Sequence, residues 1–376
     1  MIRIISLAVL FLGSLLVIFR APTNLLWYVS ILITEFCWIF ILPVVMLLLW
    51  KTGSTPYQLI GTVLGLATIG LLLVPIIQAY SLGQKLEKEF EAIFPTKNGS
   101  PTLPFQPLKM MTGIGASKVN AKTFVYDDNK GLKLDFYTSQ NACIRPCVIV
   151  IHGGSWAAGD SKQLPELNSE LAKEGYHVAS MNYRLAPDHH YPAPIEDVQT
   201  ALQFLNNNAG SLLIDTGGYV LLGRSAGAQI ALSTAYTLKE EKIRGVVDFY
   251  GPTDMVWGYE NPTNPLVLDS RKVMEDYLGG TLTEKRDEYI HSSATETVTT
   301  QTPATLMIYG ENDPLVSPRH GTRLSVKLKE KGIQFFELYL AWGTHGFDYT
   351  LNGPGGQLST WAVKRFLQFV FKNGHN

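Results

Sequence analysis

An excess of either charge is absent from this chain. Its 376 residues include 31 lysines and arginines against 32 aspartates and glutamates. Proteins that bind nucleic acid usually present a basic surface, so we predict no nucleic-acid partner. Only 17% of the residues are charged, whereas 46% are hydrophobic. That apolar share is enough for a membrane region and one full globular core.

Cysteine is scarce as well. A scaffold held by disulfides is excluded because the three cysteines cannot all pair. Cys143 and Cys147 would form a bridge only in an oxidising compartment, and free thiols are an equally good interpretation. The sequence also lacks zinc-ligand spacing, a phosphate-binding loop and a dinucleotide fingerprint. We therefore predict neither a metal nor a cofactor.

Long apolar runs are abundant in the first fifth of the chain. They cover residues 4–19, 25–50 and 59–77. A membrane span needs about 20 apolar residues, so the second and third runs are long enough and the first is marginal. A cleaved signal peptide is the alternative for the first run, but Phe19 and Arg20 make a poor cleavage site. We predict about three transmembrane helices in residues 1–80.

Basic residues beside these runs indicate an orientation. Three spans would leave Arg20, Lys85, Lys88 and Lys97 on the side of the remaining chain, and Arg3 and Lys51 on the other. Because lysine and arginine collect on the cytoplasmic side of membranes, this distribution favours a multi-pass membrane protein with its larger domain in the cytoplasm. Glu35, the one acid within residues 25–50, is expected to be neutral or to have a partner.

A connecting segment follows over residues 81–118. Residues 81–92 have the apolar spacing of an amphipathic helix, which would lie on the membrane or dock on the next domain. Prolines then mark a linker.

From residue 119 onward, strand-like and helical patterns alternate. A hairpin is predicted at residues 122–126 and 132–137. Further strands are predicted at residues 147–151, 177–182, 219–222, 246–250, 305–309 and 335–340. Helices are predicted at residues 162–173, 194–207, 226–239, 318–331 and 357–371. This alternation predicts an α/β domain with a mostly parallel sheet covered on both faces.

Two glycine-rich strings carry the chemistry. The string Gly223-Arg224-Ser225-Ala226-Gly227 follows an apolar run and precedes an alanine-rich stretch. A strand, a tight turn and a helix would expose the Ser225 hydroxyl on a strained elbow. The earlier string, His152-Gly153-Gly154-Ser155-Trp156, also follows a predicted strand. Its backbone N–H groups would stabilise a developing oxyanion.

A nucleophilic serine needs a base and an acid that orients it. Four histidines follow the serine: His291, His320, His345 and His375. His345 stands in a glycine-flanked loop after a predicted strand, and it is the candidate base. His320 falls in a predicted helix, where we expect a solvent-facing side chain. Asp313 follows another predicted strand and is the candidate acid, with Glu311 as the alternative.

Further segments extend the pattern at matching order and spacing. They are Asn182-Tyr183-Arg184-Leu185-Ala186-Pro187, Tyr191-Pro192-Ala193-Pro194-Ile195-Glu196-Asp197-Val198, Asp313-Pro314-Leu315-Val316 and His345-Gly346-Phe347. With the two glycine strings, they make the chain from about residue 120 to 374 resemble the α/β-hydrolase fold. Within that fold it looks like the hormone-sensitive-lipase-like carboxylesterases and the feruloyl-esterase-like group.

The resemblance implies catalytic roles. It assigns Ser225 as nucleophile, His345 as base and Asp313 as the orienting acid. It assigns the oxyanion hole to the N–H groups of Gly153, Gly154 and Ala226. Two positions depart from the pattern: Ser155 replaces a third glycine, and Arg224 stands where lipase-like members usually have aspartate.

The substrate is less well defined. Residues 254–302 lack strand patterns and would form a lid or pocket insertion within a catalytic domain of residues 119–376. Trp156 and Trp257 are the candidate pocket residues. The function expected is a membrane-anchored serine carboxylesterase or lipase-like hydrolase acting on a lipophilic ester. The alternatives are an amidase or formamidase with the same triad, and a non-catalytic binding or scaffold protein.

Overall fold

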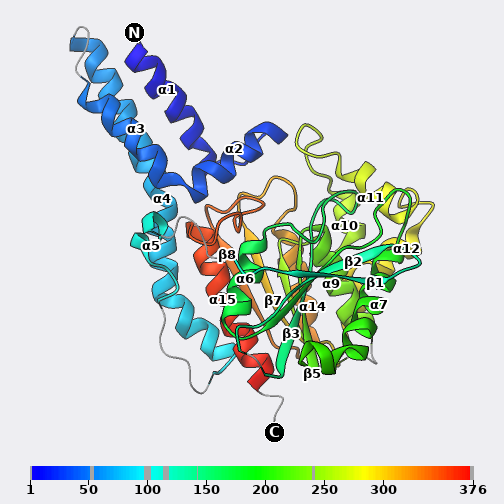
Figure 1. The fold of residues 1–376 in the computed structure, drawn as a ribbon. Coiled ribbons are helices and arrows are strands. Elements are labelled where there is room, and N and C mark those ends of the chain that lie inside the picture. The colour runs from blue at the N-terminus through cyan, green and yellow to red at the C-terminus, as the bar shows by residue number, and fades with distance from the viewer. Residues whose placement is uncertain are drawn as a thin grey trace.

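The computed structural model describes residues 2–50, 55–96, 103–112, 118–141, 143–238 and 242–372. Lys51, Lys97, Lys239 and His375 lie outside the described residues. The chain forms an α/β domain built on one twisted sheet, and a helical unit made by the N-terminal residues projects from it (Figure 1).

The sheet has eight strands in the order β1-β2-β4-β3-β5-β6-β7-β8. The strands are β1 Lys122–Asp127, β2 Leu132–Tyr137, β3 Arg145–Ile151, β4 His177–Met181, β5 Ile214–Arg224, β6 Ile243–Phe249, β7 Ala304–Gly310 and β8 Phe335–Leu340. Strand β2 pairs antiparallel with β1 and β4, and all later pairings are parallel. The predicted α/β fold with a mostly parallel sheet is confirmed, and every predicted strand is present.

Helices cover both faces of this sheet (Figure 1). The principal ones are α6 Pro165–Lys173, α7 Ala193–Asn207, α9 Ala226–Thr237, α14 Arg319–Glu330 and α15 Pro354–Lys372. Shorter helices are α5 Pro107–Thr112, α8 Ala209–Leu212, α10 Met255–Glu260, α11 Ser270–Leu278, α12 Arg286–His291 and α13 Ala294–Thr297. Residues 254–302, which carry no strand pattern, therefore form mainly short helices.

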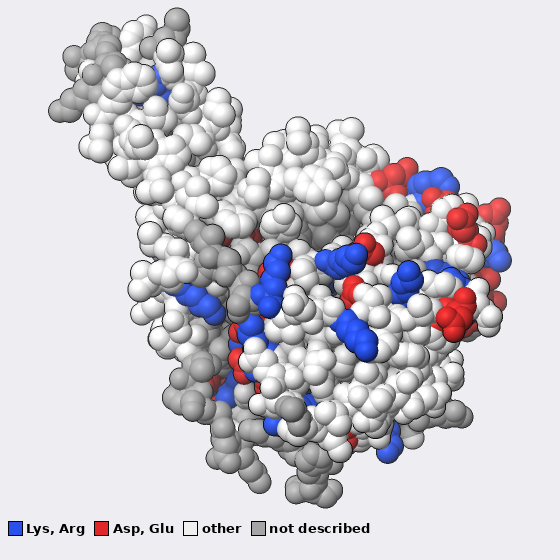
Figure 2. Space-filling view, viewed as in Figure 1, with Lys and Arg blue, Asp and Glu red and all other residues white. Residues whose placement is uncertain are grey.

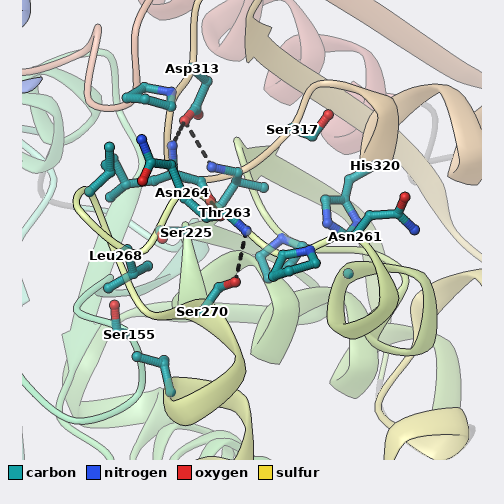
Figure 3. Close-up of a pocket in the computed structure, with 18 of the residues that line it drawn as sticks. Ser155, Ser225, Asn261, Thr263, Asn264, Leu268, Ser270, Asp313, Ser317 and His320 are labelled. Atoms are coloured by element: carbon teal, nitrogen blue, oxygen red, sulfur yellow. Dashed lines mark hydrogen bonds between the residues drawn. The ribbon is translucent and has the colours of Figure 1, made fainter. Parts of the chain in front are cut away.

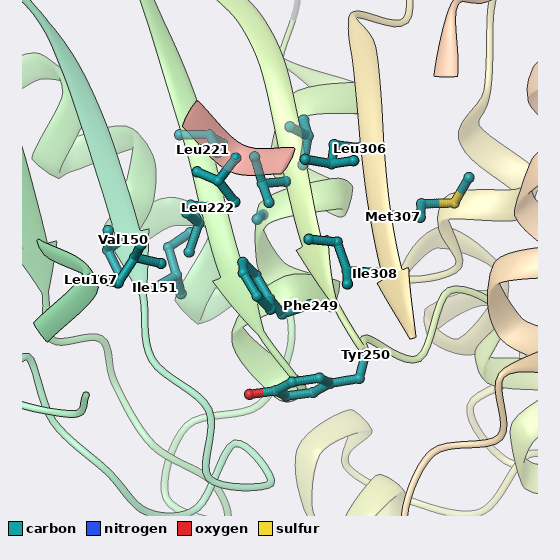
Figure 4. Packing of buried hydrophobic residues seen from close by; sticks show 14 of the residues in the cluster. Val150, Ile151, Leu167, Leu221, Leu222, Phe249, Tyr250, Leu306, Met307 and Ile308 are labelled. Carbon is teal, nitrogen blue, oxygen red and sulfur yellow. The ribbon is translucent and has the colours of Figure 1, made fainter. Parts of the chain in front are cut away.

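The core lies between the central strands and these helices. Strands β3, β5, β6 and β7 are largely buried, and apolar runs such as 147–151, 219–222 and 306–309 lie within them, as expected for parallel strands under two helical layers. Figure 4 shows Val150, Leu222, Phe249 and Ile308 interleaved in this layer. The rigid core fixes the carboxyl ends of the strands, where the functional loops begin.

The projecting unit contains four helices: α1 Ile2–Ser14, α2 Asn24–Glu35, α3 Cys37–Leu49 and α4 Thr55–Ile93, with a short 3₁₀ turn, η1 Leu15–Val17. Among the described helices, only α4 is by itself long and apolar enough to cross a membrane. Helices α2 and α3 would reach that length only as one segment, but they are bent by 84°. The prediction of about three transmembrane helices is therefore not confirmed.

Short length explains this outcome. Helices α1 and α3 have 13 residues each, or about 20 Å at 1.5 Å per residue, against a hydrocarbon core of about 30 Å. They pack instead on the apolar half of α4. Arg3 of α1 is buried and donates to the carbonyl of Leu47 in α3 and to the Thr62 hydroxyl in α4. On α4, Gly65 lies directly against Leu48, so a side chain there would collide.

The second half of α4 docks on the α/β domain. Phe90 contacts Phe336 of β8 with ring centroids 4.9 Å apart, and it also packs on Trp361 of α15. Arg365 of α15 forms an ion pair with Glu91. The amphipathic helix predicted at residues 81–92 thus continues the apolar helix and covers the domain rather than lying free on a membrane surface.

Charge is distributed unevenly over the molecule. Figure 2 shows lysine, arginine, aspartate and glutamate side chains over the α/β domain, whereas the visible face of the projecting unit is almost free of them. The three cysteines are free: Cys143 is exposed, and Cys147 is buried in β3. The pairing of Cys143 with Cys147 does not occur in this structure.

Candidate active site

Ser225 stands on a strained turn between β5 and α9. Its φ of 53° lies in the left-handed region, which non-glycine residues adopt at a cost, usually at functional sites. The flanking glycines make the turn possible. A Cβ at Gly223 would overlap the carbonyl of Gly227, and one at Gly227 would overlap the carbonyl of Ile151. The predicted strand–turn–helix elbow is therefore present.

Asp313 and His345 lie together. Asp313 follows β7 and His345 follows β8, and the two strands are neighbours in the sheet. His345 Nδ1 is 2.6 Å from Asp313 Oδ2, and both side chains are buried. The other carboxylate oxygen accepts the N–H groups of Leu315 and Val316 at 2.7 and 2.9 Å. These bonds hold the carboxylate at a fixed angle to the imidazole.

A cavity of about 580 Å³ lies in front of the elbow (Figure 3). Ser225, Ala226 and Asp313 line it, together with Ser155 and Trp156 of the glycine loop at residues 152–156. Much of the opposite wall comes from α10, α11 and the segment between them, so part of residues 254–302 forms a side of the pocket.

The glycine loop adopts backbone conformations that few residues tolerate. Gly154 has φ 125° and Ser155 has φ 54°. The Tyr183 hydroxyl donates to the His152 carbonyl at 3.1 Å, and the two rings stack. The Gly153 N–H donates to Gln163 Oε1 at 2.7 Å. Of the three N–H groups predicted for an oxyanion hole, that of Gly153 is therefore occupied by a side chain.

The two predicted pocket tryptophans both line the cavity. Trp156 is largely buried: its ring stacks on Tyr277 at 4.5 Å, and its Nε1 donates to Gln229 Oε1 at 3.0 Å. Trp257 stands edge-on to His320 at 4.9 Å. His320 also lines the cavity and is buried, so the expectation of a solvent-facing side chain is wrong.

A buried ion pair behind the elbow was not anticipated from the sequence. Arg224 Nε lies 2.5 Å from Asp348 Oδ2, and the Tyr250 hydroxyl donates to the other oxygen of Asp348 at 2.5 Å. Tyr250 in turn packs on the His345 ring at 4.3 Å. Arg224 could have indicated this arrangement, since an arginine inside a core requires an acidic partner.

The N-terminal unit also contributes to the site. Arg20, Ala21 and Pro22 line the cavity. Trp27 of α2 donates from Nε1 to the His345 carbonyl at 2.8 Å. No sequence motif marks these residues, because the contact depends on how α2 lies on the α/β domain.

Glu35 at the end of α2 is buried and accepts the N–H of Gly355 at 2.9 Å. Gly355 lies in the first turn of α15, where the helix dipole favours an acidic partner. The expectation that Glu35 has a partner or is neutral is met by these bonds.

Comparison with solved structures shows the fold. Esterases of the fungus Rhizomucor miehei align with a TM-score of 0.61 and 21% identity, covering 78% of this chain and 97% of theirs. An esterase of Pyrobaculum calidifontis aligns with a TM-score of 0.59 and 20% identity, covering 79% of this chain and 95% of its own. Both support the α/β-hydrolase architecture.

The alignments with curated relatives cover less of this chain than the structural alignments do. Esterase LipC of Mycobacterium tuberculosis is 24% identical over 276 residues, which cover 68% of this chain and 66% of LipC. Arylacetamide deacetylase of Bos taurus is 39% identical over 103 residues, 26% of each chain. The chain spans between about half and two thirds of the length of the first curated relatives it matches. The family model BD-FAE matches residues 134–328, just over half of the chain. With its motifs in order on an α/β-hydrolase fold, the chain belongs to the BD-FAE family.

Proposed function

We propose that this protein is a membrane-anchored serine hydrolase that cleaves carboxylic esters. The observation that carries the proposal is the hydrogen bond between Asp313 and His345, placed beside a cavity that the strained Ser225 also lines. Because His345 Nδ1 donates to the carboxylate, its Nε2 is left to accept a proton from Ser225. Behind the elbow, this arrangement is supported by the hydrogen bonds that Asp348 accepts from Arg224 and Tyr250.

The reaction proceeds in two acyl-transfer steps. Ser225 Oγ attacks the ester carbonyl as its proton moves to His345, and the alcohol leaves with that proton. Water activated by His345 then releases the acid and restores the serine. No cofactor is required for these steps.

The oxyanion is stabilised by backbone N–H groups. Ala226 is the first residue of α9, so its N–H has no intrahelical acceptor and is free for this purpose. Gly154 is the second donor. The Gly153 N–H would contribute only if substrate displaced the Gln163 side chain that now accepts from it.

Membrane anchoring belongs to the same proposal. The apolar half of α4 would insert in the bilayer with α1 and α3 packed against it. Arg20, Ala21 and Pro22 of the N-terminal unit line the cavity, so an inserted α4 would hold the cavity near the membrane surface. This position favours a lipophilic or amphiphilic ester that partitions to the bilayer.

Covalent labelling tests the proposal. The full chain, purified in detergent, should react with a fluorophosphonate probe and hydrolyse p-nitrophenyl butyrate. Ser225→Ala should abolish labelling and lower kcat by about 10³-fold or more, because the triad acts as a unit. Ser211→Ala, a change at an exposed serine of α8, should leave both unchanged.

Two results would contradict the proposal. A wild-type chain that neither labels nor hydrolyses esters would point to a binding or scaffold role. Faster turnover of p-nitroanilides than of the matched p-nitrophenyl esters would assign the triad to amide substrates.

A further inference from the structure

His320 occupies an unusual position for a residue near the start of a surface helix. It is the second residue of α14, yet only 5% of it is exposed, and it lines the cavity together with Ser225. The next residue explains the burial. A Cβ at Gly321 would lie 2.8 Å from both the Tyr309 ring and the Tyr339 hydroxyl. This close approach brings the start of α14 against β7 and β8 and turns the imidazole inward.

The tautomer of His320 is fixed by its neighbours. Nδ1 accepts the N–H groups of Thr253 and Asp254, at 3.2 and 3.3 Å. A ring nitrogen that accepts hydrogen bonds carries no proton, so the proton of the neutral ring is on Nε2. Burial lowers the pKa of His320 to about 4, which keeps the ring neutral at ordinary pH. The Thr253 hydroxyl donates to the His320 carbonyl at 2.7 Å and holds the residue in place.

The Nε2–H group of His320 is therefore a hydrogen-bond donor whose direction is fixed by the ring. Within the part of the chain that the structure describes, it has no hydrogen-bond partner, whereas Nδ1, the carbonyl and the backbone N–H of His320 each have one. The Nε2 atom is not among the fully buried side-chain atoms that lack a partner, so it reaches the open space of the cavity. Because His320 lines the cavity, the partner can come from a bound molecule.

The surrounding wall is mixed, with polar side chains among apolar ones such as Leu268 and Met274. Figure 3 shows Asn261 near His320, and Ser317, Thr263, Asn264 and Ser270 also line the cavity.

We infer that His320 is a substrate-binding residue, and that its Nε2–H donates to an oxygen of the substrate outside the scissile ester group. The substrate class is then an ester that carries an ether, hydroxyl or carbonyl oxygen beyond the reacting carbon. This inference rests on the proposed function and narrows it.

Matched esters test the inference in the full chain. The acyl pair is p-nitrophenyl butyrate and p-nitrophenyl methoxyacetate, and the alcohol pair is butyl butyrate and 2-methoxyethyl butyrate. Within each pair, one oxygen replaces one methylene. The measured quantity is the ratio of kcat/KM for the oxygen-bearing ester to that for its partner, compared between variants so that intrinsic ester reactivity cancels.

Two substitutions test the Nε2–H donor of His320 separately from its Nδ1 acceptor. In His320→Asn, the side-chain oxygen can replace Nδ1 as acceptor for Thr253 and Asp254, but no donor reaches the Nε2 position. In His320→Gln, the longer amide restores a donor there. We expect His320→Asn to lower this kcat/KM ratio about threefold to tenfold in one of the two pairs, the effect of losing one hydrogen bond. We expect His320→Gln to keep the ratio close to that of the wild type.

A binding measurement gives a second readout that needs no change at His320. The Ser225→Ala chain, whose turnover should be at least about 10³-fold slower, should bind the oxygen-bearing ester of that pair at least about threefold more tightly than its methylene partner. Unchanged ratios in both pairs for His320→Asn, or equal affinities in the Ser225→Ala chain, would overturn the inference. Ester turnover that still depends on Ser225 would then leave the proposed function intact, whereas absence of turnover and labelling would remove the proposed function itself.

Discussion

At the scale of single residues, buried charges behind the elbow are the main unexpected feature. Arg224 and Asp348 are both almost fully buried, and each is neutralised by the other. Replacing a buried ion pair by apolar residues is often harmless, but breaking one by removing a partner leaves an uncompensated charge. Removing either Arg224 or Asp348 would therefore leave the charge of the other buried without a counter-charge. The hydrogen bond from Tyr250 to Asp348 also holds Tyr250 beside His345.

Asp348→Asn tests this dependence. The substitution keeps the shape of the side chain but leaves the Arg224 guanidinium buried without a counter-charge. We expect the free energy of unfolding to fall by about 3–5 kcal/mol, measured by guanidinium titration. Asp276→Asn is the control, because the Lys272–Asp276 pair is solvent-exposed and its loss should cost less than about 1 kcal/mol. Equal effects of the two substitutions would contradict the prediction.

Asp248 has a different environment, in which the protonated form is favoured. Burial raises its pKa to about 7. The Tyr309 hydroxyl lies within hydrogen-bond distance of two acceptors, Asp248 Oδ2 at 2.7 Å and the Gly251 carbonyl at 2.6 Å, but it has one proton to donate. A protonated Asp248 supplies the second proton, so both contacts are satisfied.

A pH dependence follows from the raised pKa. Between its ordinary value of 3.8 and about 7, the folded state binds more protons at Asp248 than the unfolded chain does. The Asp248 contribution to stability is therefore complete below pH 4 and is lost as pH rises toward 7, at up to about 1.4 kcal/mol per pH unit. Asp248→Asn should remove this contribution. Unfolding titrations at pH 5, 6 and 7 should show the variant gaining stability relative to the wild type as pH rises, and a constant difference would refute the assignment.

At the scale of elements, helix α2 connects the N-terminal unit to the loop that carries His345. It lies within an apolar run that resembles a membrane span, yet it turns away from α3 by 84° and docks on the α/β domain. Trp27, Ser30 and Glu35 each bond to residues that follow β8. The loop that carries His345 is thus supported by the N-terminal unit rather than only by its own domain.

Trp27→Phe tests that support. It keeps an aromatic ring but removes the Nε1–H that donates to the His345 carbonyl. We expect kcat/KM for p-nitrophenyl butyrate to fall about twofold to tenfold, the range for one lost hydrogen bond. The neighbouring Tyr28→Phe serves as control, because Tyr28 is 54% exposed and its activity should match the wild type. Identical rates in both variants would show that the contact does not affect the histidine.

At the scale of the whole molecule, α4 joins the two parts as one element. Its 39 residues extend about 58 Å, enough for an inserted half and a docked half. The cavity is thereby held at a set distance from the apolar unit, with Arg20, Ala21 and Pro22 at its wall.

The side of the membrane is predicted from charge. Lys85 and Lys88 follow the apolar half of α4, and with three spans, four basic residues would flank the α/β domain against two on the other side. On that three-span arrangement, which the sequence predicts but the helices of the structure do not confirm, the positive-inside rule predicts a cytoplasmic domain. Alkaline phosphatase fused after Asn376 should then be inactive, and green fluorescent protein fused there should fluoresce. Active phosphatase would place the domain outside the cytoplasm.

The sequence by itself determined the catalytic domain and its fold. Strand runs, helical periodicity and the elbow glycines are local signals, because each arises from residues adjacent in the chain. The predicted strands appear within a few residues of their positions, and the elbow forms because Gly223 and Gly227 allow close approach. The sequence proposed Ser225, Asp313 and His345 as the triad because each follows a recognisable strand, and the structure places Asp313 and His345 within hydrogen-bond distance.

Tertiary structure alone decided the remaining features. An apolar run has the same composition whether lipid or protein covers it, so only packing revealed that α2 docks on the domain. A polar residue in a helix resembles a surface residue until its neighbours are known, and a close approach at Gly321 buried His320. Arg224 found its acid 124 positions away. Such contacts depend on distances in space, which local sequence patterns do not encode.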